Sequence, residues 1–291
     1  MPKIPLLNIP QGYRSQSRDT SREMDYLQCS IWQKMPLYQK AELTIGITQG
    51  SRKLTLQGIK NKYPRSTPQE QRFLYSKIVL GDNVNNIISN KIEEPIMIGN
   101  PIELALLMAE ILDSLNIVYF VGGSVASSLW GETRATLDID IVADLTLEKI
   151  EDFITKVEPL FYVSEEAIKE AIIYQSSFNL IHFNTSEKID IFIPNQSYLI
   201  QTEIQRKILQ QVEENGRFLY LATPEDIILE KLILSRQGNK ISERQWRDVL
   251  GVLKVQSNSL DFDYLTYWAK EENLSTLLNQ ALFESGLSKS I

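Results

Sequence analysis

Two aspartates separated by one residue, Asp138 and Asp140, alternate with apolar residues in the run DIDIV at residues 138–142. Successive side chains of a strand point to opposite faces, so the two carboxylates should share one face while Ile139 and Ile141 pack into a core. Two neighbouring carboxylates repel each other unless a cation compensates them. Mg²⁺ prefers such oxygen ligands and fills the rest of its shell with water and substrate phosphates. The pair therefore predicts a magnesium site, although a single pair of this kind is more often a solvated strand edge.

A glycine turn precedes the aspartates, directly after an apolar run at residues 118–121 that predicts a short buried strand. Gly122 and Gly123 let the backbone turn sharply and come close to a ligand. Ser124 follows at the position expected for the N-cap of a helix over residues 125–130. Backbone amides at such a helix start, with a serine hydroxyl beside them, could bind a phosphate. A phosphate site next to a metal site is what phosphoryl or nucleotidyl transfer from a nucleoside triphosphate requires.

A third carboxylate repeats the strand pattern later in the chain. Residues 188–193 read KIDIFI, and this alternation places Asp190 on the face opposite the isoleucines. If this strand lies beside the first acidic strand, Asp190 joins Asp138 and Asp140. Three such carboxylates can hold two Mg²⁺ ions about 3.5–4 Å apart.

The Gly123-Ser124 turn, the Asp138-x-Asp140 pair and the later carboxylate resemble the nucleotidyltransferase superfamily related to DNA polymerase β. The resemblance covers roughly residues 102–253, and the branch that the chain resembles is that of the AbiEii-type toxin nucleotidyltransferases. It implies an α+β fold with a mixed sheet flanked by helices. It also implies Mg²⁺-dependent transfer of a nucleoside monophosphate from a nucleoside triphosphate to an acceptor hydroxyl, with Asp190 accepting the proton of that hydroxyl.

The same resemblance assigns two further residues. Residues 223–232, TPEDIILEKL, resemble the third motif of the toxin branch, which implies that Lys231 contacts the nucleotide. The alternative for this lysine, which lies inside an otherwise apolar helix, is that its ammonium extends past the apolar side chains to water. The pair Arg247-Asp248 resembles the fourth motif and implies a catalytic role for Asp248, against the alternative of an ion pair on a helix surface.

Composition limits the classes of protein that the chain can represent. It has 291 residues, of which 43% are hydrophobic, enough for one large domain or two modest ones. Its single cysteine, Cys29, and single histidine, His182, exclude an internal disulfide, zinc fingers and histidine-based metal sites. No apolar run is long enough to span a membrane, and the N-terminus lacks the apolar core of a signal peptide. A cytoplasmic protein is expected.

Charge is distributed unevenly along the chain. Residues 1–90 hold 13 Lys/Arg and 6 Asp/Glu, a net charge of +7, whereas the remainder carries −14. A basic module joined to an acidic one suggests contact with a polyanion such as RNA. The alternative is a small helical module with a lysine-rich solvated face.

Periodicity and turn residues predict how the chain is divided. The expected parts are a flexible arm at 1–20, a helical module at 21–82, a linker at 83–100, a nucleotidyltransferase core at 101–222 and a C-terminal helical region at 223–291. Separate helices are expected at 37–48 and 55–62 in the module, and a helix is expected at 201–212 in the core.

Several acceptors are compatible with these residues. The toxin branch implies RNA or a protein, whereas antibiotic-modifying nucleotidyltransferases act on a small molecule. A non-catalytic module that binds a nucleotide or a partner is the remaining alternative. The resemblance to a toxin branch also suggests a cognate antitoxin as a partner.

Overall fold

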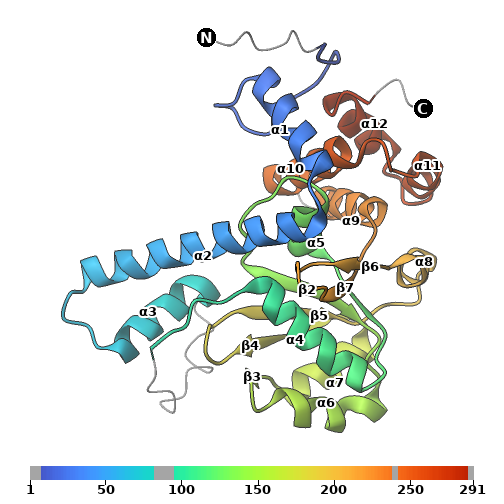
Figure 1. The fold of residues 1–291 in the computed structure, drawn as a ribbon. Coiled ribbons are helices and arrows are strands. Elements are labelled where there is room, and N and C mark those ends of the chain that lie inside the picture. Colours follow the sequence, from blue (N-terminus) through green and yellow to red (C-terminus); the bar gives the residue numbers. More distant parts are fainter. Residues whose placement is uncertain (1–7, 82–94, 238–241, 288–291) are drawn as a thin grey trace. The chain divides into compact units, whose positions relative to one another are not determined.

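The computed structural model describes residues 8–81, 95–237 and 242–287 (Figure 1). The chain divides into two compact units. Unit 1 comprises Met1–Lys40, Ala126–Thr133 and Thr223–Ile291, and unit 2 comprises Ala41–Val125 and Arg134–Ala222. The expected linker at 83–100 falls mostly outside the described residues. The domain limits expected from the sequence remain predictions.

Within its described residues, unit 2 is built on a mixed sheet of seven strands in the order β3-β4-β5-β2-β1-β7-β6. The pairs β2–β5 and β1–β7 are parallel, and the other neighbours are antiparallel. The structure therefore confirms the expected α+β class, a mixed sheet flanked by helices. The strands are β1 (Tyr119–Val121), β2 (Asp138–Ala143), β3 (Phe161–Tyr162), β4 (Ser177–His182), β5 (Lys188–Phe192), β6 (Ile208–Gln211) and β7 (Phe218–Leu221).

One face of the sheet is apolar and covered by helices. Helix α4 packs against β1, β2 and β7, α6 contacts α4 and α7, and α7 lies on β4 (Figure 1). Ile139 and Ile141 lie on this face and are at most 1% exposed. Burying a side chain of this size stabilises the fold by about 1.5–3 kcal/mol, so a one-residue slip of β2 is strongly disfavoured. The aspartates of β2 are thereby fixed on the opposite face. The helices are α4 (Pro101–Ser114), α6 (Ile150–Val157), which follows the 3-10 turn Leu147–Lys149, α7 (Glu165–Tyr174) and α8 (Tyr198–Arg206).

Helix α2 runs without a break over Leu37–Lys62, although the sequence predicts two helices there. Gly50 suggests a break, but two side chains one helical turn apart hold the helix in place on either side of it. The hydroxyl of Thr48 accepts a hydrogen bond from the Thr136 amide at 3.2 Å, and Arg52 forms a buried ion pair with Glu187. Tertiary contacts thus override the local signal. Helix α3 (Pro68–Leu80) follows, and Thr67 and Glu70 form a capping box at its start.

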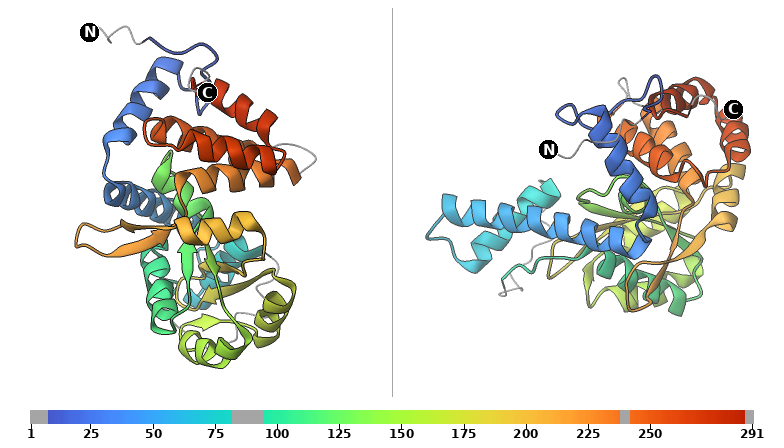
Figure 2. Two further views of the ribbon diagram at one scale, coloured as in Figure 1. Left: turned by 90° about the vertical axis from the view of Figure 1, so that its right-hand side faces the viewer. Right: turned by 45° about the horizontal axis from the view of Figure 1, so that its top comes forward.

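The helix expected at 201–212 is also wrong in part. Helix α8 ends at Arg206, and Ile208–Gln211 forms β6, which pairs with β7 in an antiparallel hairpin (Figure 2). The sequence of β6, ILQQ, does not alternate between apolar and polar residues, so it gives no strand signal. This segment is a strand because its backbone pairs with β7. The turn signal Asn215-Gly216 at the tip could have indicated the hairpin. Gly216 has φ +89°, the left-handed conformation that such turns need.

Unit 1 is helical in its described residues. Helix α10 contacts α1, α9 and α12, and α11 contacts α9 and α12. The helices expected after residue 223 are confirmed. No helix within the described ranges is long and apolar enough to cross a membrane. The helices are α1 (Arg22–Lys34), α9 (Pro224–Gln237), α10 (Glu243–Gln256), α11 (Phe262–Glu271) and α12 (Ser275–Glu284), together with most of α5 (Gly123–Trp130).

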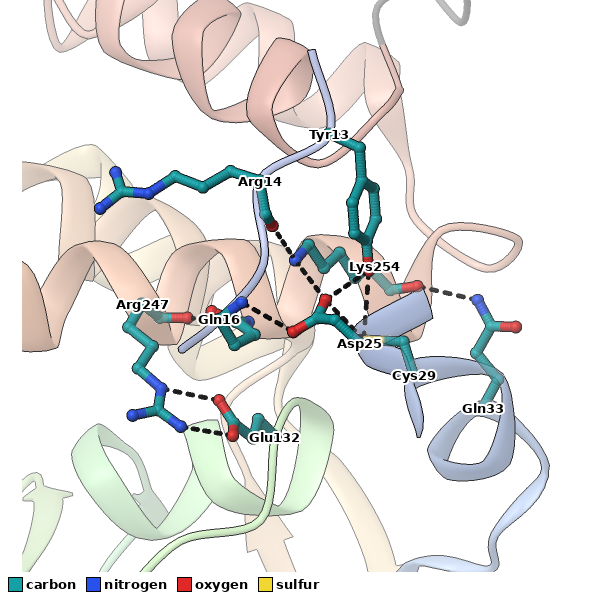
Figure 3. A network of polar contacts seen from close by, with 9 residues as sticks. All are labelled: Tyr13, Arg14, Gln16, Asp25, Cys29, Gln33, Glu132, Arg247 and Lys254. Carbon is teal, nitrogen blue, oxygen red and sulfur yellow. Dashed lines mark hydrogen bonds and ion pairs between the residues drawn. The ribbon is translucent and has the colours of Figure 1, made fainter. Parts of the chain in front are cut away.

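A buried ion pair joins α1 to α10 (Figure 3). Lys254 Nζ lies 2.9 Å from Asp25 Oδ2, and the two side chains are 2% and 4% exposed. Asp25 also accepts hydrogen bonds from the Tyr13 hydroxyl at 2.6 Å and from the Gln16 amide at 2.7 Å. Tyr13 and Gln16, which lie in the stretch expected as a flexible arm, are therefore bound to α1 of unit 1.

Removing one partner of this pair should destabilise unit 1. Lys254→Met leaves the Asp25 carboxylate buried without its counterion, which is expected to lower the free energy of unfolding by about 3–5 kcal/mol. Urea denaturation followed by the fluorescence of Trp32 and Trp246 measures the loss.

Lys270→Met, which removes an exposed lysine of α11 in the same unit, is the matched control and should change the free energy by less than about 0.5 kcal/mol. The double variant D25N/K254M should recover part of the loss. Equal effects of K254M and K270M would contradict a structural role for the buried pair.

Candidate active site

The three predicted carboxylates lie on one face of two neighbouring strands. In the parallel pair β2–β5, Asp140 is the direct cross-strand partner of Asp190, and Asp138 is the partner of Lys188. This confirms the expectation that the two acidic strands are adjacent. The side chain of Asp138 is 42% exposed and that of Asp190 is 18% exposed. The face is therefore open to a ligand, although Asp190 is largely withdrawn from water.

The glycine turn is in direct contact with this face. The Gly122 amide donates to the backbone carbonyl of Asp140 at 2.9 Å, and the Ser124 amide donates to its Oδ2 atom at 3.1 Å. Gly123 has φ +51°, and a Cβ atom added there would lie 1.8 Å from Asp140 Oδ2. Glycine is thus required at position 123 both for its conformation and for the close approach of the carboxylate.

Ser124 is not the N-cap that the sequence predicts, because α5 already begins at Gly123. Its hydroxyl shares a hydrogen bond with the Thr136 hydroxyl and donates to the Asp138 carbonyl at 3.1 Å. These bonds attach the turn to the start of β2. With only 6% of Ser124 exposed, the hydroxyl serves this attachment in the present conformation, and its contact with a phosphate stays a prediction.

Lys188 belongs to the site, and the sequence reasoning missed it. Its Nζ atom lies 2.8 Å from Asp190 Oδ2 and 3.8 Å from Asp138 Oδ1. Burial opposes the charged form of the lysine, but the hydrogen bond to Asp190 and the neighbouring carboxylates outweigh it and raise its pKa. Burial also raises the pKa of Asp190, and the bond from Lys188 offsets this only in part. Lys188 precedes Asp190 by two residues, as Asp138 precedes Asp140, so a parallel register would have indicated its position.

Asn179 was missed as well. It lies on β4 as the antiparallel partner of Asp190 and is exposed, between the buried Phe178 and Leu180. The alternation in β4 could have placed this amide on the carboxylate face. It adds an uncharged donor and acceptor to a row that otherwise holds Asp140 and Asp190.

The donor set suits a hard divalent cation, because three carboxylates point from one face. Among the residues that the structure describes, however, no three acidic, histidine or cysteine side chains are gathered closely enough to hold a metal ion. Instead, the ammonium of Lys188 forms ion pairs with the carboxylates of Asp138 and Asp190. Asp138 and Asp140 fit a divalent ion by their chemistry, and the expected pair of Mg²⁺ ions stays a prediction.

Helix α2 fixes the start of both acidic strands. Thr48 binds the amide of Thr136, two residues before β2 reaches its aspartates at Asp138. Arg52 pairs with Glu187, the residue directly before β5, and the two side chains are 4% and 2% exposed. A change in α2 would therefore be transmitted to both carboxylate strands.

The two remaining predicted residues belong to unit 1, whereas the three carboxylates belong to unit 2. Lys231 lies in α9 and is 4% exposed. Asp248 lies in α10, is 8% exposed and accepts a hydrogen bond from the Ser127 hydroxyl at 3.4 Å. Its neighbour Arg247 forms a bidentate ion pair with Glu132 (Figure 3). The roles of Lys231 and Asp248 beside the carboxylates stay predictions.

Comparisons with known proteins give a limited result. No protein-family model matches the sequence, and no curated protein matches it. Among solved structures, the chain is similar to an antigenic nucleotidyltransferase-like protein from Paracoccidioides brasiliensis, at 19% identity and a TM-score of 0.38, over 62% of this chain and 91% of that one. It is also similar to the lincosamide antibiotic adenylyltransferase LnuA bound to lincomycin, at 18% identity and a TM-score of 0.34, over 53% of this chain and 97% of that one. The antibiotic-resistance factor ANT(2'')-Ia gives 18% identity and a TM-score of 0.39, over 62% and 97% of the two chains. Similarities this weak establish neither the family nor the activity of the chain.

Substitution of Gly123 should separate the cost of conformation from the cost of contact. Gly123→Ala places a side chain in the left-handed region and against Asp140, whereas Gly216→Ala, at φ +89°, meets no atom within 4 Å. The left-handed conformation alone costs about 1–2 kcal/mol, so G123A should lower the free energy of unfolding by clearly more than G216A. Urea denaturation of both variants measures the difference. Equal losses would mean that Asp140 simply moves aside.

Proposed function

We propose that the chain is a Mg²⁺-dependent nucleotidyltransferase of the DNA polymerase β-like superfamily, moving a nucleoside monophosphate from a nucleoside triphosphate to an acceptor hydroxyl. One observation carries the proposal. The register of β2 and β5 pairs Asp140 with Asp190 on a face that contacts the Gly122–Ser124 turn. The turn that we propose binds phosphate therefore adjoins the acidic face.

The carboxylates of Asp138, Asp140 and Asp190 would hold the metal, which when bound polarises the phosphate and neutralises its charge. The amides at the start of α5 would bind the β- and γ-phosphates, since a helix start attracts anions. The Ser124 amide donates to Asp140 in the present conformation, so a phosphate would share or take over this donor.

The reaction requires one bond to form and one to break. The acceptor oxygen bonds to the α-phosphorus, the bond between that phosphorus and the β-bridging oxygen breaks, and pyrophosphate leaves with the electron pair. The proton of the acceptor hydroxyl passes to Asp190, whose raised pKa, caused by burial, suits a proton acceptor. From unit 1, Lys231 would neutralise developing charge on the nucleotide, and Asp248 would take the catalytic role that the AbiEii-type resemblance implies.

We favour RNA as the acceptor because the α2–α3 part of unit 2 is basic. Residues 41–81 contain seven Lys/Arg and two Asp/Glu. Tyr63 at the end of α2 is 42% exposed, with the Lys62 ammonium 5.5 Å from its ring centroid, and an exposed aromatic ring among cations suits stacking on a base. A toxin-like role and a cognate antitoxin are proposed only on the basis of the AbiEii-type resemblance. The exposed basic residues of this surface are Lys53, Lys60, Lys62, Arg65 and Lys77.

Removal of one carboxylate charge should abolish transfer. Asp138→Asn, Asp140→Asn and Asp190→Asn keep the side-chain size but lose a metal-binding charge, and each should lower the rate at least about 100-fold. The assay combines each α-labelled nucleoside triphosphate with Mg²⁺ and total RNA or cell lysate. Thermal unfolding checks that each variant is folded.

The control is Asp152→Asn, which changes an exposed carboxylate on α6 and should leave the rate unaltered. Undiminished transfer by a folded D138N protein would refute the metal role. Label on a protein or a small molecule would reassign the acceptor, and no label with any nucleotide would favour a non-catalytic binding module.

Neutralising the basic surface should weaken the use of RNA without affecting the chemistry. K60Q/K62Q removes two cations, so the plot of log affinity for RNA against log salt concentration should become less steep, its slope decreasing in magnitude by about 1.4–1.8. Nitrocellulose filter binding at several salt concentrations measures the slope. K156Q/K169Q, with two exposed lysines on α6 and α7, is the matched control. Equal slopes in both double variants would remove α2–α3 as the RNA surface.

A further inference from the structure

We propose that Lys188 is a fixed cation that takes the place of one of two divalent ions, so that the carboxylate site binds a single divalent ion. The proposal rests on the proposed function only for its catalytic meaning. The number of divalent ions bound to the site can be measured without any reaction.

The position of the ammonium carries the proposal. Lys188 is the cross-strand partner of Asp138 and lies two residues from Asp190 on the same strand face. Its Nζ atom is 2.8 Å from Asp190 Oδ2 and 3.8 Å from Asp138 Oδ1. A Mg²⁺ ion needs oxygen ligands at about 2.0–2.1 Å. An ion bound between these same two oxygens would meet the ammonium at a short, repulsive distance.

The net charge of the site also favours a single divalent ion. The three carboxylates carry three negative charges, and Lys188 reduces the local charge to minus two. One divalent ion neutralises this charge, whereas a second would make the protein side of the site net positive before the nucleotide arrives. Lys188 is 29% exposed and Asp190 is 18% exposed, so water screens their attraction only in part.

Lys188 cannot easily swing its backbone away from the carboxylates. The preceding residue, Glu187, is 2% exposed and ion-paired with Arg52 of α2. The lysine is therefore a positioning residue for Asp190. Its ammonium takes the metal contact that the proposed function gives to Asp190, and the single ion binds through Asp138 and Asp140. Asp190 then keeps its hydrogen bond from Lys188 and stays in place as the proton acceptor.

Counting bound Mn²⁺ ions tests the proposal. The full chain without nucleotide is titrated with Mn²⁺, and free Mn²⁺ is followed by electron paramagnetic resonance. The wild-type protein should bind one ion per chain. Lys188→Gln should bind two, or bind the first at least 10-fold more tightly, whereas Lys188→Arg, which keeps the charge, should still bind one. Asp190→Asn added to K188Q should remove the second ion.

Lys169→Gln, which removes an exposed lysine of α7 that pairs with Glu165, controls for the loss of a positive charge elsewhere and should leave the count at one. Two ions in the wild type overturn the inference, even if K188Q does not fold, but leave the proposed function intact. One ion with equal affinity in wild type and K188Q also overturns it. No binding at millimolar Mn²⁺ would overturn both the inference and the metal role in the proposed function.

Discussion

Repulsion between like charges on neighbouring strands is the constraint around which unit 2 is built. Asp140 and Asp190 are direct cross-strand partners, an arrangement that destabilises a sheet unless other groups compensate it. The compensation comes from the Lys188 ammonium and from the Ser124 amide, which binds the Asp140 carboxylate. Two like charges stay paired across strands only when burial of the opposite, apolar face fixes the register of those strands. The buried isoleucines of β2 and β5 form that apolar face.

The supporting elements serve the same constraint from outside the sheet. Arg52 anchors the chain just before β5, and Thr48, one turn earlier on α2, anchors the loop that leads into β2. Gly123 lets the carboxylate of Asp140 approach the turn more closely than any side chain would allow. The site thus depends on a rigid helix, a glycine and a lysine in addition to its three acids. Such support is what precise positioning of charged groups requires.

Short-range patterns sufficed to predict part of this arrangement. The alternation in β2 and β5 indicated which side chains face the core, and it placed Asp190 beside the other aspartates once the strands were assumed to be neighbours. The features that were missed depend on contacts between distant residues. Lys188 becomes part of the site only through the parallel register, α2 continues past Gly50 because of Thr48 and Arg52, and β6 is a strand because β7 pairs with it. The start of the helix after the turn was misplaced by two residues, since α5 begins at Gly123 and not after Ser124. Lys231 and Asp248 lie in the other unit, and only the motif resemblance relates them to the carboxylates.

The division of the chain has a practical consequence for dissecting the protein. Unit 1 is assembled from three stretches of chain, and the short stretch Ala126–Thr133 is inserted between the glycine turn and β2. Shortening the chain after Ala222 would therefore not release unit 2 as a clean fragment. It would strip α9 and α10 from the residues left behind, so that Asp25 loses Lys254 and Glu132 loses Arg247. Two carboxylates that are now neutralised would remain without their partners, and the shortened polypeptide would be prone to misfolding or proteolysis.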